Sequence, residues 1–144
     1  MKKPIYITLL GLLVLGFAYI TWSDSLPPRT PLKVARLISG LEISNEVKFK
    51  MLRDEWSPNG DGVTHIRATL TDQELNDFIN QSIQKGYKRL PIKETSPGLI
   101  LPDGATDRMN GYYRLDQDKE HPGDFTFTII DAQQKEMIVY INYM

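Results

Sequence analysis

Cysteine is absent from the 144-residue chain. The protein therefore has no disulfide framework, no thiolate nucleophile, no cysteine-based zinc site and no cysteine that could carry a lipid. Apolar residues make up 41% of the chain and charged residues 24%, which is an ordinary composition for a globular protein. We therefore expect a folded domain that is stabilised by its hydrophobic core alone.

The chain also lacks an excess of positive charge. Residues 31–144 contain 14 basic and 17 acidic residues, so this part of the chain carries a formal charge of -3. Its lysines and arginines are scattered along the sequence and form no stripe that would follow a phosphate backbone. This pattern indicates that nucleic acid is not a partner.

Common catalytic signatures are missing as well. The sequence has no Gly-x-Ser-x-Gly elbow, no phosphate-binding loop, no dinucleotide-binding glycine motif and no His-Glu-x-x-His helix. Of the two histidines, His65 shares a predicted strand face with Arg67 and Thr69 and is expected to be solvated, while His121 precedes a Pro-Gly turn. We expect no catalytic residue, no metal ligand and no cofactor, and hence a protein that is not an enzyme.

Two acidic segments are candidate cation sites. Asn59 and Asp61, followed by Gly62, resemble part of a calcium loop, but Ser57 and Ala68 stand where its first and last carboxylates belong. Because this segment separates two strand-like runs, it is better interpreted as a hairpin turn. The second segment is interpreted as a solvated loop, and its acidic residues are Asp116, Asp118, Glu120 and Asp124.

The first thirty residues contain the longest apolar run. After Lys2 and Lys3, residues 5–22 carry no charge, and as a helix this run would be about 27 Å long, close to the thickness of a bilayer core. Tyr19 and Trp22 close the run, where aromatic rings favour lipid headgroups. We expect residues 1–22 to form a single-pass anchor in the cytoplasmic membrane, with the N-terminus inside and the domain in the periplasm or the extracellular space.

Two alternatives to the anchor remain open. Ser23 and Ser25 could direct cleavage of a signal peptide before Leu26, which would secrete the domain. A buried core helix over residues 5–22 is the other alternative. Residues 23–31, which are rich in proline, are expected to form a stiff linker in any of these cases.

Residues 32–144 are predicted to form an α+β domain. A short helix ending near Gly40 and a second helix beginning at Thr71, with Glu74 completing a capping box, should pack on one face of a small antiparallel sheet. Strands are expected on both sides of the 57–62 turn and over residues 111–116, 125–131 and 136–143, with a long loop over 91–111. The apolar positions assigned to the two helices are Val34, Leu37, Ile38, Leu41, Leu75, Phe78, Ile79 and Ile83.

Exposed aromatic residues are the remaining candidates for a binding role, because aromatic side chains often anchor interfaces. Trp56, Tyr112 and Tyr113 are the predicted partner-binding residues. The sequence favours a non-enzymatic protein-interaction module, such as an immunity-type antitoxin or an envelope adaptor. A domain that binds a small ligand, a cation or a cell-wall glycan is the alternative, and a hydrolase of envelope polymers, using carboxylates such as Asp54 and Glu55, is a weaker one.

Overall fold

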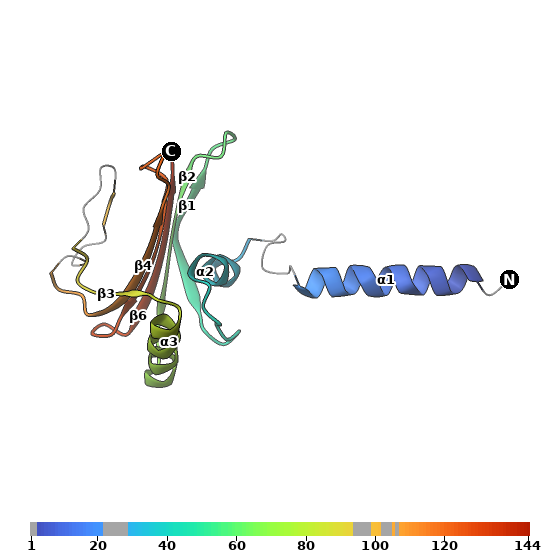
Figure 1. The fold of residues 1–144 in the computed structure, drawn as a ribbon, viewed down its shortest axis with the longest axis horizontal. Coiled ribbons are helices and arrows are strands. Elements are labelled where there is room, and N and C mark those ends of the chain that lie inside the picture. Colours follow the sequence, from blue (N-terminus) through green and yellow to red (C-terminus); the bar gives the residue numbers. More distant parts are fainter. Residues whose placement is uncertain (1–2, 22–28, 94–98, 102–104, 106) are drawn as a thin grey trace.

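The computed structural model describes residues 3–21, 29–93, 99–101, 105 and 107–144, with the side chains of the first helix described from Leu10 to Ile20. Three helices and six strands follow one another along the chain (Figure 1). Their bounds are α1 (Lys3–Thr21), α2 (Pro31–Ser39), β1 (Phe49–Trp56), β2 (Gly62–Thr69), α3 (Asp72–Gln84), β3 (Lys88–Arg89), β4 (Gly111–Gln117), β5 (Phe125–Asp131) and β6 (Glu136–Tyr143).

The strands form one antiparallel sheet in the order β1-β2-β6-β5-β4-β3. This sheet and its helices confirm the predicted α+β class. The last strand, β6, lies between β2 and β5, where Val139 is paired with Ile66 and Thr128. Its apolar residues are therefore buried on both faces, as the pattern of residues 136–143 predicted.

Helices α2 and α3 pack on the same face of the sheet and share one core with β2, β5 and β6. Helix α2 begins after Thr30, whose hydroxyl accepts a hydrogen bond from the Lys33 N–H, and ends at Gly40 with a left-handed φ of 64°. Helix α3 begins with the predicted capping box, in which Glu74 and Thr71 each accept a bond from the other's backbone N–H. Both helix positions predicted from the sequence are confirmed.

Two side chains that were assigned to the helical core are exposed. Leu37 on α2 is 60% exposed and Ile83 on α3 is 55% exposed, so these assignments were wrong. The fully buried ridge of each helix is narrow, and the predicted core residues Ile38 and Ile79 pack partly buried beside it. The buried ridge consists of Val34, Ala35 and Ser39 in α2 and of Leu75, Phe78 and Ser82 in α3. The helical period alone does not show how wide that ridge is.

A second core covers the other face of the sheet. Its members on the strands include Tyr113, Phe127 and Ile138, and segments from the predicted loop over 91–111 pack on them through Ile92 and Ala105. The backbone of Ile92 donates a hydrogen bond of 2.8 Å to the carbonyl of Ala105. Residues 94–98, 102–104 and 106 of that loop lie outside the described residues. We call this side of the sheet the loop face and the other side the helix face.

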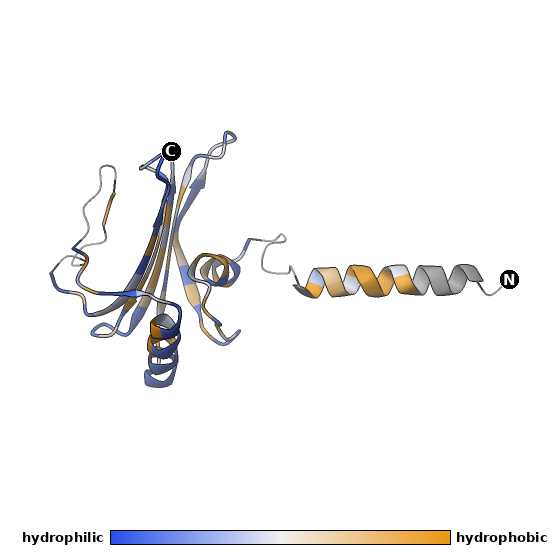
Figure 2. Ribbon diagram, viewed as in Figure 1, coloured by the Kyte–Doolittle hydropathy of each residue, from blue (hydrophilic) through white to orange (hydrophobic). Residues whose placement is uncertain are grey.

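Helix α1 stands apart from the sheet and its two helices (Figure 1). Its described half is dominated by hydrophobic residues (Figure 2), and eight large apolar side chains between Leu10 and Ile20 are 57–75% exposed. Within the part of the chain that the structure describes, no helix combines the length and the apolar character needed to cross a membrane. Residues 23–28 of the predicted 23–31 linker and the possible cleavage position at Ser25 lie outside the described residues, and Pro31 is the first residue of α2.

Candidate functional site

The β1–β2 hairpin forms one end of the sheet, with β1 as its edge strand. Its turn is closed by the Ser57 N–H, which donates to the carbonyl of Asp61 at 2.8 Å, and by Gly60 with a φ of 98°. This segment is a hairpin turn, as predicted. Among the described residues, no group of three or more histidine or acidic side chains is placed to hold a metal ion. The hairpin carries aromatic and polar side chains on its helix face and basic side chains on its loop face.

On the helix face, the end of the hairpin carries a cluster that we call the Trp56 surface, formed by Arg29, Asp54, Trp56, Thr64 and Tyr143. Trp56 is opposite Gly62 on β2, and Gly62 is opposite Tyr143 on β6. Because Gly62 has no side chain, the two rings meet edge to face across it, with centroids 6.0 Å apart. A side chain at this position would collide with Trp56, since an added Cβ would lie 2.5 Å from its ring.

The hydroxyl of Thr64 connects the polar groups of the Trp56 surface. Thr64 is fully buried, and its Oγ1 donates to Asp54 at 2.7 Å while accepting from Arg29 and from the indole N–H of Trp56, each at 3.0 Å. The Arg29 guanidinium also lies 4.5 Å from the centre of the Trp56 ring and 3.8 Å from the Asp54 carboxylate. Arg29, which precedes α2, is therefore fixed onto the hairpin.

On the loop face, four basic side chains occupy adjacent positions on β1 and β2. Lys50 is paired with Arg67, and Arg53 is paired with His65, so the four form two neighbouring rows that we call the basic block. The next strand continues one row with Tyr140, whose ring lies edge to face with His65 at a centroid distance of 5.7 Å. The domain is acidic as a whole, and this block places three of its cations, Lys50, Arg53 and Arg67, on one face.

Two of these cations have acidic neighbours. Arg53 donates to Glu55 at 2.6 Å, and this pair raises the pKa of Arg53 and lowers that of Glu55. Arg67 lies 3.6 Å from Glu136. Within the described chain, the Nε of Arg67 and the Nε2 of His65 are buried and make no hydrogen bond. These two nitrogens are covered by the protein itself.

His65 is not the solvated histidine that the sequence indicated. Its side chain is partly buried beside Tyr140. Burial, and then the positive charge of Arg67, lower the pKa of His65. His65 is therefore neutral at pH 7, and the strand pattern misplaced it because the side chains of β6 cover that face of β2.

The three predicted partner-binding residues do not come together. Trp56 is 38% exposed at the hairpin end, whereas Tyr113 is 3% exposed and stacks on Phe127 in the loop-face core. Tyr112 lies on the opposite face of β4, partly buried, with the Arg89 guanidinium 5.9 Å from its ring centre. Of the three, Trp56 presents the largest accessible ring surface.

The carboxylates considered for hydrolysis are also apart. Asp54 belongs to the Trp56 surface on the helix face, while its neighbour Glu55 pairs with Arg53 on the loop face. Asp118 accepts bonds from two backbone N–H groups in its turn, which lower its pKa, and Asp124 accepts one from the Met144 N–H. These acidic residues stabilise turns and strand ends.

Sequence reasoning missed Arg29 and Tyr143. Arg29 is 35 residues from Thr64 along the chain, and Tyr143 joins Trp56 only because β6 lies beside β2. Neither contact follows from local periodicity. The strand order would have been needed to find them.

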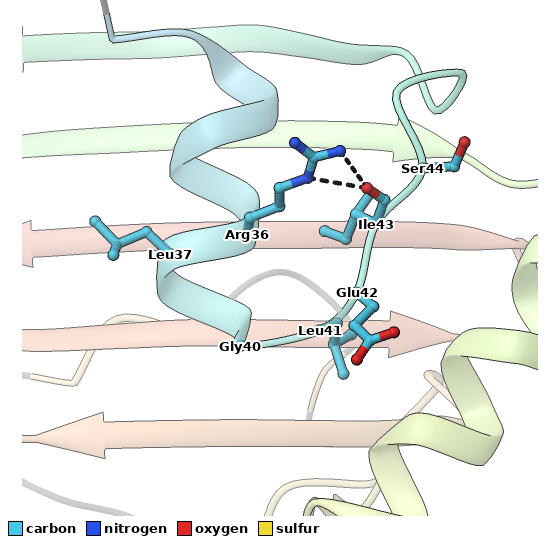
Figure 3. Close-up of a pocket in the computed structure, with 7 residues that line it drawn as sticks. All are labelled: Arg36, Leu37, Gly40, Leu41, Glu42, Ile43 and Ser44. Atoms are coloured by element: carbon cyan, nitrogen blue, oxygen red, sulfur yellow. Dashed lines mark hydrogen bonds between the residues drawn. The ribbon is translucent and has the colours of Figure 1, made fainter. Parts of the chain in front are cut away.

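A hollow of about 670 Å³ lies beside α2. Figure 3 shows Arg36 reaching across to the carbonyl of Ile43, to which its Nε donates at 2.9 Å, so this side chain holds the loop after α2. Leu37 points to the opposite side of the helix in the same view. A smaller hollow of about 310 Å³ lies between residues 42–47 and α3. Comparison of the chain with protein families, with curated proteins and with solved structures gives no match.

Proposed function

We propose that this protein is a membrane-tethered, extracytoplasmic interaction module, which acts by binding another protein and not by catalysis. Residues 5–22 hold the chain in the cytoplasmic membrane, and the α+β domain lies on its outer side. An immunity-type antitoxin or an envelope adaptor would have this organisation.

The observation that carries the tether is the exposure of α1. Leu10, Leu12, Leu13 and Leu15 lie on different sides of the helix, and each is at least 63% exposed. Burial of one such side chain is worth about 1.5–3 kcal/mol, so a helix with this surface is stabilised by transfer out of water. The charge-free run over 5–22 and the lysines before it support insertion with the N-terminus inside.

Membrane extraction tests the tether. The full chain, expressed in bacterial cells, should stay in the membrane fraction after a carbonate wash and should be released by detergent. The double variant L12R/L13R should move to the soluble fraction, because each arginine near the centre of a spanning helix costs about 2.5–3.5 kcal/mol. The control variant I83R changes an exposed isoleucine on α3 and should remain in the membrane. Release of the wild-type chain by carbonate alone would refute the tether.

The basic block is the surface that supports binding of an acidic protein. Lys50, Arg53 and Arg67 lie side by side on a domain with more acidic than basic residues. The side chains of Arg53 and Arg67 are 52% and 42% exposed, so an aspartate or glutamate of a partner can reach their guanidinium groups and form a charge-assisted bond. Complementary charge of this kind directs both the rate and the specificity of association.

Site-specific crosslinking tests this binding surface. A photoreactive amino acid at Lys50 of the full chain should give one discrete protein adduct in native membranes, attached to an acidic segment of the partner. The R53E/R67E background should abolish the adduct, and the same amino acid at Gln73 on α3 is the control position. An adduct of equal strength at Gln73, or adducts only with lipid, would contradict the assignment.

A further inference from the structure

We infer that the Trp56 surface faces the bilayer and docks on lipid headgroups. This inference rests on the proposed tether and adds an orientation to it. It assigns the helix-face end of the β1–β2 hairpin to the membrane and leaves the basic block on the other face of the hairpin free for a partner.

The first step is the length of the tether. Helix α1 ends at Thr21, and the next described residue is Arg29. A chain segment of eight peptide steps reaches no further than roughly 30 Å, whatever its path. Arg29 must therefore lie within that distance of the outer end of the membrane helix.

The second step is where Arg29 is held. Its guanidinium contacts Trp56 at 4.5 Å from the ring centre and donates to Thr64 at 3.0 Å. These contacts fix the end of the tether directly on the Trp56 surface. Among the described parts of the domain, this surface is thus attached to the membrane by the shortest connection.

The third step is the chemistry of the surface. Trp56 and Tyr143 are 38% and 37% exposed, and Arg29 stands beside them. Tryptophan and tyrosine are enriched where proteins meet lipid headgroups, because their rings have an apolar body and a polar edge. Arginine can keep its stem in the apolar layer while its guanidinium reaches lipid phosphates.

Leu37 points toward the same end of the sheet as the Trp56 surface (Figure 3). It is 60% exposed on α2, and Figure 3 shows its side chain pointing away from the 41–44 loop, toward the end of the sheet where β2 begins and β6 ends. Trp56 and Tyr143 lie at that same end. An exposed aliphatic side chain directed toward the end of the sheet that carries exposed aromatic rings suits a shallow headgroup contact.

Fluorescence quenching in vesicles tests the inference. The full chain carrying W22F, in which Trp56 is the single tryptophan, is reconstituted into vesicles of phosphatidylethanolamine and phosphatidylglycerol. A nitroxide attached to the lipid headgroups should remove most of the Trp56 emission. The control chain carries W22F and W56F with Gln73→Trp, at the start of α3 and at the opposite end of β2, and should keep most of its emission.

Flotation of the same vesicles separates the two proposals. If the chain does not float with the vesicles, the tether fails and the orientation fails with it. If the chain floats but Trp56 and the tryptophan at position 73 are quenched equally, or neither is quenched, the orientation alone is overturned. Protection of Trp56 from a water-soluble quencher in native membranes, without quenching by labelled lipid, would show that a protein covers this surface and would also overturn the lipid assignment.

Discussion

At the scale of single residues, the Thr64 hydroxyl carries contacts that join Arg29 to the hairpin. We predict that Thr64→Val destabilises the full chain by about 1–2 kcal/mol, because Arg29 loses an acceptor and Asp54 loses a donor while the side-chain shape is kept. Urea unfolding in detergent micelles measures the change. Thr69→Val, on the exposed end of the same strand, should change the free energy of unfolding by less than about 0.5 kcal/mol. Equal effects in the two variants would contradict the role of Thr64.

His65 gives the protein a defined response to pH. The pKa of His65 is lowered in the folded state, so the unfolded chain binds the proton first as the pH falls. The free energy of unfolding should therefore decrease as the pH drops through 6.5, the ordinary pKa of histidine. Well above pH 6.5, His65 should not make the stability depend on pH. His65→Gln should remove this part of the pH dependence between about pH 8 and pH 5. If the free energies of unfolding of the wild-type chain and of His65→Gln change with pH in parallel, His65 is not the source of this pH dependence.

The binding residues were only partly accessible to sequence reasoning. Trp56 was found because it precedes a turn, and it is exposed. Tyr113 looked equivalent to Tyr112 in the sequence, but alternation along β4 places it in the loop-face core. Arg29 was missed because its partners on β1 and β2 are distant in sequence, and no local pattern reports such a contact.

At the scale of elements, local signals placed most helices and strands. The capping box at Thr71 and the alternation over 125–131 and 136–143 each correspond to an observed element. The two-residue strand β3 and the order of the strands were not predicted, because both depend on pairing between distant segments. The widths of the buried ridges on α2 and α3 were misjudged for the same reason.

The capping box offers a prediction for α3. Thr71→Ala should lower the free energy of unfolding by about 0.5–2 kcal/mol, because the Glu74 N–H loses its acceptor. Thr71→Ser keeps a hydroxyl at the same position and should retain most of the stability. Urea titration of both variants compares them, and an equal loss in serine and alanine would show that the bond is not the source of the effect.

The central strand offers a second prediction at this scale. Met137 on β6 is fully buried between the helices and the sheet, so Met137→Ala should cost about 2–5 kcal/mol through lost contacts and a residual cavity. Met144, one residue beyond the same strand, is 66% exposed and provides a matched control. A thermal or urea unfolding series that finds similar losses for Met137→Ala and Met144→Ala would be inconsistent with this packing.

At the scale of the whole molecule, the protein combines an exposed apolar helix, a short connection and a domain whose hairpin end receives that connection. The domain has two cores on opposite faces of one sheet, so the hairpin is displayed from a rigid support. In our proposal, its helix face lies toward the bilayer and its loop face presents the basic block to a partner. Both assignments depend on α1 being in the membrane.

Cysteine accessibility tests most directly whether α1 spans the membrane with the domain on the outer side. The natural chain has no cysteine that would react with the probe. A single cysteine at Gln73, exposed on α3, should react with a membrane-impermeant maleimide added outside cells whose outer barrier has been opened. A single cysteine at Lys3 should react only after the cytoplasmic membrane is broken. Labelling of both positions before lysis, or of neither, would contradict a tethered domain on the outer side of the membrane.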